Sequence, residues 1–116
     1  MMMIDISKLK IFVKPGPTDF RKQINGLSII VQEKMGFDPL NGNLYIFCNK
    51  TRNRLKILYW DKTGFCMWFK RLEKNKFPWP RNSEEALEID IAKMQMLLSG
   101  IDFWNAHKEL KYSKIN

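Results

Sequence analysis

Residues 55–72 read LKILYWDKTGFCMWFKRL, and this stretch decides the fold that the sequence predicts. Two runs of aromatic and aliphatic residues, 55–61 and 65–72, flank Lys62-Thr63-Gly64, a short connection with a glycine where a positive φ would be needed. Runs of this composition around a short, glycine-containing connection are typical of a β-hairpin. The stretch therefore predicts two antiparallel strands joined by a tight turn.

The hairpin is expected to belong to a larger antiparallel sheet. Upstream, residues 44–48 are aromatic and β-branched enough for a buried strand, and residues 50–53 make a looser turn into the hairpin. Residues 10–14 predict a short first strand, which Pro15-Gly16-Pro17 stops. Downstream, residues 76–80 contain two prolines, which cannot donate to a β-ladder. This run is therefore expected at an edge or in an extended arm, where the sheet ends.

Two helices are expected to pack on the sheet. Thr18 or Asp19 can cap the first helix, and Gly36 supplies its end. Between them the apolar residues recur every three or four positions; they are Phe20, Ile24, Leu27, Val31 and Met35. Gly26 costs a helix about 1 kcal/mol relative to alanine, so we expect it where the helix presses closely on the sheet. Asp90 can cap the second helix, which has a broad apolar face.

This order of elements predicts an α+β fold. We expect an antiparallel β-meander of about four to five strands, with an N-terminal amphipathic helix and a C-terminal helix packed on it. The 116 residues, 45% of them hydrophobic, have room for one core. Residues 1–104 are therefore expected to form a single domain, and residues 105–116 a polar tail that frays.

Several classes of protein are excluded by composition. No apolar run approaches the roughly 20 residues that cross a bilayer, so no membrane partner is expected. Residues 1–7 lack a basic region followed by an apolar core, and we therefore expect a cytoplasmic protein. Cys48 and Cys66 lie 18 positions apart, and the chain has a single histidine, which favours reduced core thiols over a metal site. No cofactor is expected.

The net charge of +8 is concentrated in the middle of the chain. Residues 50–81 hold ten Lys and Arg residues against Asp61 and Glu73, whereas the flanking segments carry +2 and −2 and cancel. Seven of the fifteen aromatic residues lie in the same segment, so it is expected to be folded. Cationic side chains release counterions from phosphates, and exposed rings stack on unpaired bases. The segment therefore predicts a surface that binds DNA, or alternatively RNA.

Strand alternation refines this prediction. If the odd-numbered residues of both hairpin strands face the helices, Lys56 and Trp60 lie on an open face of the sheet together with Trp68 and Lys70. The reverse assignment would bury charges, at several kcal/mol for each unpaired one. The residues predicted to bind nucleic acid are Arg21, Lys22, Arg52, Arg54, Lys56, Trp60, Trp68, Lys70, Arg71, Lys74, Lys76 and Arg81.

Two other interpretations of these residues stay open. The tryptophans of the segment can complete the core or a dimer contact, with the lysines as a soluble rim. Arg21 and Lys22 follow the expected start of the first helix, whose amides could hold a phosphate, but Asp19 competes for those amides. Arg21 is then expected to pair with Asp19 or Asp61. The oligomeric state is not predicted.

Carboxylates are too scattered to predict catalysis. Asp19 reads as a helix cap, Asp61 as a turn residue and Glu73 as an ion-pair partner of Arg71 or Lys74. No spacing among the acidic residues selects a metal ion, as a metal-dependent nuclease would need. We therefore expect no catalytic residues and no enzymatic activity.

Short motifs in the chain match one family in order and with compatible spacing. They are Thr18 to Lys22, residues 55–61, Gly64-Phe65, residues 68–73, Phe77 with Trp79-Pro80, and residues 97–103. Over about Leu9 to Trp104 the chain resembles the short accessory protein of the IS66 bacterial insertion sequences, the second open reading frame product often called TnpB. Phe20 stands where methionine is usual, and Phe103 where tryptophan is usual.

The resemblance implies a protein that is encoded in a mobile element beside a separate transposase and supports transposition; it does not imply catalysis. It makes the transposase of the same element an expected partner. Two alternatives to nucleic-acid binding stay open: a module that docks on the transposase without contacting DNA, and, more remotely, a metal-dependent nuclease.

Overall fold

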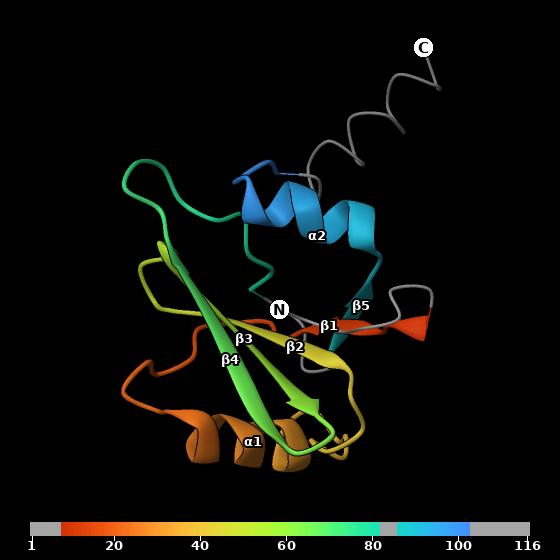
Figure 1. The fold of residues 1–116 in the computed structure, drawn as a ribbon. Helices are drawn as coiled ribbons and strands as arrows, with labels where there is room; N and C mark the ends of the chain where they lie inside the picture. Colours follow the sequence, from red (N-terminus) through yellow and green to blue (C-terminus); the bar gives the residue numbers. More distant parts are fainter. Residues whose placement is uncertain (1–7, 82–85, 103–116) are drawn as a thin grey trace.

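The computed structural model describes residues 8–81 and 86–102, which form a five-stranded mixed sheet between two helices (Figure 1). The predicted tail, residues 105–116, lies outside the described residues. In chain order the elements are β1 (Ile11–Val13), α1 (Ile24–Glu33), β2 (Leu44–Cys48), β3 (Arg54–Asp61), β4 (Gly64–Arg71), β5 (Leu87–Ile89) and α2 (Ile91–Leu98). The strand order across the sheet is β4-β3-β2-β1-β5. No helix in the described part of the chain is long and apolar enough to cross a membrane.

The α+β class agrees with the prediction, but the sheet is not a simple meander. β2, β3 and β4 are antiparallel neighbours in sequence order, as predicted. β1, however, pairs with β2 in parallel, because the chain between them crosses over through α1. β1 also pairs with β5, a strand that the sequence pattern did not indicate.

Residues 76–80 form an arm, as one alternative predicted, but the sheet does not end there, because β5 follows. Phe77 and Trp79 of this arm are buried, and the Trp79 side chain is only 7% exposed. Its Nε1–H donates to the carbonyl oxygens of Lys14 (3.1 Å) and Gly16 (3.0 Å). The arm therefore ties the segment that follows β1 to the core.

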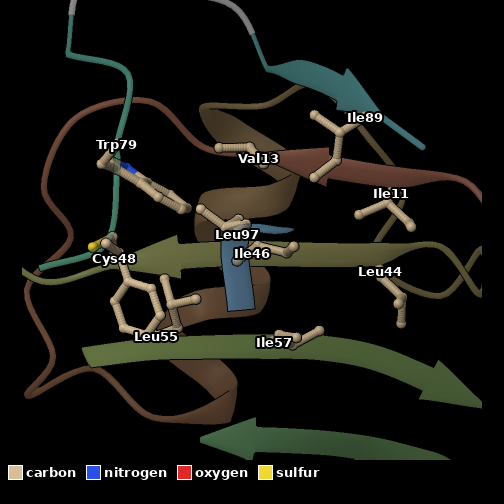
Figure 2. Packing of buried hydrophobic residues seen from close by; sticks show 11 residues of the cluster. Ile11, Val13, Leu44, Ile46, Cys48, Leu55, Ile57, Trp79, Ile89 and Leu97 are labelled. Atoms are coloured by element: carbon tan, nitrogen blue, oxygen red, sulfur yellow. The ribbon is translucent and has the colours of Figure 1, made fainter. Parts of the chain in front are cut away.

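Helices cover both faces of the sheet. Odd-numbered residues of β3, such as Leu55 and Ile57, pack on the side of α2, where Leu97 lies over Ile46 (Figure 2). The even-numbered Leu58 packs on the opposite side against Leu27 and Val31 of α1. The two clusters are separate layers of one core. The central strands therefore have no open face.

The helix ends differ in how well they were predicted. α1 begins at Ile24, later than a cap at Thr18 or Asp19 would place it, and the preceding Gln23 makes no side-chain cap. Asp90 caps α2 as predicted, since its Oδ1 accepts from the Lys93 N–H at 2.8 Å. Gly36, with φ at +77°, lies just beyond α1 as its predicted end.

The prediction for Gly26 was wrong. A Cβ at this position would lie 3.0 Å from the Cβ of Lys22, and the nearest atoms all belong to that side chain rather than to the sheet. Residues 19–22 form a turn closed by the Lys22 N–H and the Asp19 carbonyl, and they do not form the first turns of the helix.

Candidate nucleic-acid interface

Three connections meet at one end of the sheet, at the left of Figure 1. They are residues 14–22 after β1, residues 49–53 between β2 and β3, and residues 72–81 after β4. Backbone hydrogen bonds hold them together: Thr18 N–H to the Cys48 carbonyl (2.8 Å), Gly16 N–H to Pro80 (2.8 Å) and Phe77 N–H to Arg52 (2.7 Å). Ligands commonly bind where parallel strands end in this way.

This end of the sheet holds all of the net charge of the chain. Residues 14–22, 49–54 and 71–81 carry ten basic residues and two acidic ones, a net of +8, and the rest of the sequence is neutral. We call this set the basic end; it consists of Lys14, Arg21, Lys22, Lys50, Arg52, Arg54, Arg71, Lys74, Lys76 and Arg81. The fold thus adds the segment around residue 20 to the cationic stretch that the sequence indicated.

Each acidic residue of the basic end is held by an arginine two positions away in the sequence. Arg21 Nη2 lies 2.7 Å from Asp19 Oδ2, and its Nε also donates to this carboxylate. The hydrogen bonds from Arg21 lower the pKa of Asp19 to about 2. Arg71 pairs with Glu73 at 2.9 Å. The Asp19 and Glu73 pairings agree with predicted alternatives, and both carboxylates are neutralised without using the other cations.

Most of the predicted cationic residues of the basic end are open to solvent. The exposed ones are Arg21, Lys22, Arg54, Arg71, Lys74, Lys76 and Arg81, whereas Arg52 is half-buried. Two residues that were not predicted join them: Lys50, which is exposed, and Lys14, which is half-buried. Recognition of the parallel β1–β2 pair would have indicated Lys14, because it directly follows the carboxyl end of β1.

Concave surface lies between these connections. A cavity of about 630 Å³ separates the segment after β1 from the β2–β3 turn and is lined by Phe20, Arg21, Lys50 and Arg54 among others. A neighbouring cavity of about 280 Å³ is lined by Arg52, Trp79 and Arg81, with Lys50 shared between the two. Basic side chains therefore surround grooves rather than a flat surface.

Lys56 does not belong to this exposed set, and the prediction that it lies on an open face was wrong. Its side chain is 5% exposed. The Nζ donates to the carbonyl oxygens of Phe20 (3.0 Å) and Lys22 (2.9 Å) and lies 4.7 Å from the centre of the Phe20 ring. Burial lowers the pKa of Lys56. The charge is tolerated because two carbonyls and a ring face replace water.

The predicted grouping of Trp60 and Lys56 with Trp68 and Lys70 was also wrong. Ile57 pairs with Trp68, and side chains directly opposite each other in an antiparallel pair share a face. Even-numbered residues of β4 therefore lie on the α2 side, while Trp60 and Lys56 lie on the α1 side. The cause is the turn: Gly64 is part of β4, and the positive φ, 50°, is at Lys62 instead.

The three tryptophans of the segment have different environments. Trp60 is half-buried and meets Phe65 edge to face, with ring centres 5.1 Å apart. Trp68 is 45% exposed, on the outer strand β4. Trp79 belongs to the core, which matches the alternative that tryptophans complete it. Lys70 is half-buried, and its Nζ donates to the Leu98 carbonyl at the end of α2 at 2.7 Å.

Within the part of the chain that the structure describes, no three His, Cys, Asp or Glu side chains gather as metal ligands would. Asp61 and Glu73 lie at opposite ends of the β3–β4 hairpin. Both cysteines are free thiols. Burial raises the pKa of Cys48 to about 12, which disfavours its thiolate.

Comparison with known proteins identifies the family. The family model for IS66 Orf2 like protein matches residues 9–108. The chain is 33% identical over 107 residues to "Uncharacterized protein y4hO" of Sinorhizobium fredii, covering 92% of this chain and 93% of that protein. It is 35% identical over 95 residues to "Uncharacterized protein y4jC" of the same organism, covering 82% and 81%. No solved structure matches the chain. The chain therefore belongs to the IS66 Orf2 like protein family, an accessory family of insertion sequences.

Proposed function

We propose that this protein is a non-catalytic accessory of insertion-sequence transposition that binds DNA through its basic end. The observation that carries the proposal is the segregation of charge: the full +8 lies on three connections that backbone hydrogen bonds hold side by side and on the adjoining strand ends, Arg54 of β3 and Arg71 of β4. Seven of the ten predicted cationic residues are exposed there. The binding surface is thus an end of the sheet and not a face of it.

Such a surface suits the phosphate backbone. Cationic side chains that neutralise phosphates release condensed counterions, so affinity falls steeply as salt rises. Contacts to phosphates carry no sequence information by themselves. We therefore expect binding to unrelated DNA sequences with similar affinity.

The test is DNA binding over a salt series for two charge-matched double variants. Lys50→Glu with Arg54→Glu reverses two exposed charges that line one groove of the basic end. Lys10→Glu with Lys93→Glu makes the same change in net charge at exposed positions outside it. We expect the first variant to bind more than about tenfold more weakly, with a salt dependence reduced by about two counterions. A flat salt response of the parent protein, or equal losses in both variants, contradicts the proposal.

The absence of catalysis has its own test. Supercoiled DNA incubated with the protein and Mg²⁺ or Mn²⁺ is expected to stay intact. Nicking that is lost in Asp61→Asn or Glu73→Gln would support the nuclease alternative instead.

A second candidate function, docking on the transposase of the same element, is favoured by a different feature. β4 is one of the two outer strands of the sheet and exposes Trp68 (45%) and Phe69 (50%) on its two sides. An apolar cavity of about 220 Å³ lies beside Trp68 and is also lined by Ile57, Met94 and Leu98. Exposed tryptophans are frequent anchors of protein interfaces.

Co-purification with the transposase after nuclease treatment tests this candidate. Trp68→Ala is expected to abolish the complex, whereas Ile29→Ala, an exposed apolar residue of α1, should leave it intact. A complex that survives Trp68→Ala, or one that disappears with nuclease alone, argues against direct docking at β4.

A further inference from the structure

A fourth cavity, of about 680 Å³, lies between the segment after β1 and helix α1. Its lining includes Lys14, Thr18, Lys22, Ile30, Lys34 and Met35. It shares Thr18 with the 630 Å³ groove but faces α1 rather than the β2–β3 turn. Its volume is in the range of pockets that hold small organic ligands.

Three lysines line this cavity. Within residues 8–81 and 86–102, no carboxylate forms an ion pair with Lys14, Lys22 or Lys34. Asp19 also lines the cavity, but Arg21 already holds its carboxylate. Burial and then the charge of Lys34 lower the pKa of Lys14, so these two lysines are close enough to repel each other. An anion between them would remove this repulsion.

Thr18 supplies an independent sign of a missing ligand. The residue is 5% exposed, and its backbone N–H is fixed to the end of β2. No described group bonds its Oγ1, although the atom is buried. A buried hydroxyl without a partner is destabilising by about 1–3 kcal/mol, so such atoms in native proteins call for an unseen partner. A hydroxyl can donate to a phosphate oxygen, as threonines often do.

The remaining wall is apolar. Ile30 and Met35 line the side formed by α1, and Pro15 and Pro17 line the other side. A bare phosphate ion would leave most of such a cavity unfilled. A phosphate attached to a sugar and base would occupy both parts, because the sugar and base can contact the apolar wall.

We propose that this cavity binds the phosphorylated end of a nucleic-acid strand. The terminal phosphate lies between Lys14 and Lys34, and the terminal nucleoside lies against Ile30 and Met35. The Thr18 hydroxyl, buried in the cavity wall, turns towards the phosphate and donates to it. A terminal phosphate carries up to two negative charges at neutral pH, against one for an internal phosphodiester, and so it matches three ammonium groups better. The inference rests on the proposed DNA binding and gives it a preference for strand ends.

Fluorescence polarisation tests this with one single-stranded oligonucleotide carrying a 5′-phosphate, a 3′-phosphate or no terminal phosphate. We expect the parent protein to bind one of the phosphorylated forms at least about fivefold more tightly than the unphosphorylated form. Lys34→Gln and Thr18→Val should each reduce this ratio towards one. Arg54→Gln, outside the cavity, should weaken all three without changing their ratio. Equal affinities of the parent protein for the three forms, or a ratio that survives both cavity variants, overturn the inference while leaving the basic end as a DNA site.

A second measurement separates the cavity from DNA binding altogether. Thermal unfolding is compared in inorganic phosphate and in chloride at equal ionic strength, for the parent protein and Lys34→Gln. A higher Tm in phosphate for the parent alone supports the cavity even if no DNA binding is detected. An equal phosphate effect in both proteins shows that the cavity takes no phosphate.

Discussion

The middle of the β3–β4 hairpin and the basic end use the same residue types for different purposes. Lys56 and Arg54 lie two positions apart on β3, yet Lys56 is buried against two carbonyls and Arg54 is exposed. On β4, Lys70 donates to the end of α2, while its neighbour Arg71 is open to solvent. The comparison teaches that position along the strand, relative to the helices that cover the sheet, decides whether a cation is structural or available to a ligand.

The largest expected effect separates Lys56 from Arg54. Lys56→Met keeps most of the apolar stem but leaves two carbonyls without their donor, and should lower the free energy of unfolding by about 3 kcal/mol. Arg54→Met removes an exposed group and should change it by less than about 0.5 kcal/mol. Urea denaturation measures both values. Similar losses in the two variants would erase the distinction between the two regions.

A smaller effect concerns the buried thiol of Cys48 on the central strand β2. Burial raises the pKa of Cys48 from 9.0 to about 12, so the native state keeps a proton that the unfolded chain releases above pH 9. The stability that this group contributes is therefore present below pH 9 and is lost as the pH rises towards 12, by about 2 kcal/mol at pH 10.5.

Denaturation of Cys48→Ala at pH 8 and pH 10.5 checks this sign. The variant is less stable overall but should lose about 2 kcal/mol less than the parent between the two pH values. Val13→Ala, a small deletion at another fully buried strand position, serves as the matched control. If the parent and Cys48→Ala lose the same stability between pH 8 and pH 10.5, the loss comes from other groups. Tyr59 is one of them, because burial raises its pKa to about 12.

A third prediction compares the buried Trp79 with the exposed Trp68. Trp79→Phe keeps a large ring in the core but removes the N–H that donates to the carbonyl oxygens of Lys14 and Gly16. We expect the free energy of unfolding to fall by about 1.5 kcal/mol. Trp68→Phe, at an exposed position, should cost less than about 0.5 kcal/mol. Thermal unfolding compares the two. A larger loss at position 68 would mean that the β4 ring is a core residue and not a free surface.

The smallest effect is expected at Lys70. Its ammonium bonds a carbonyl at the C-terminal end of α2, where a cation also interacts favourably with the helix dipole. Lys70→Met should lower stability by about 1 kcal/mol, and Lys74→Met, an exposed control, by close to nothing. In DNA binding the order should reverse, with Lys74→Met the weaker binder. Equal effects of the two variants in both measurements would contradict the assignment.

Features that depend on neighbouring residues could be read from the sequence. Turn and strand composition predicted β2 and the β3–β4 hairpin, and a carboxylate before an apolar run predicted the α2 cap at Asp90. Features that depend on distant residues could not. β5 has only three residues, too few for a period-2 pattern, and it exists because β1 offers it a partner.

The candidate site was likewise predictable from the sequence only in its local features. Clustering of cations in residues 50–81 was visible in the sequence, but their orientation was not. A change of one residue in the hairpin turn moves every side chain of β4 to the other face, and this reversed the expected positions of Trp68 and Lys70. The burial of Lys56 depended on carbonyls 34 and 36 positions away, which no local pattern could supply.

The sequence by itself determined the hairpin, the excess of positive charge and the family, because composition, turn residues and motif spacing are local properties. Only the tertiary structure decided where that charge acts. The crossover through α1 makes β1 parallel to β2, so the segments after both strands arrive at one end. This brings Arg21 beside Lys50 and Arg54, and Lys14 and Lys22 to the same end of the sheet. Helices then cover both sheet faces, and since a cation stays available only where nothing packs on it, the end of the sheet is what remains.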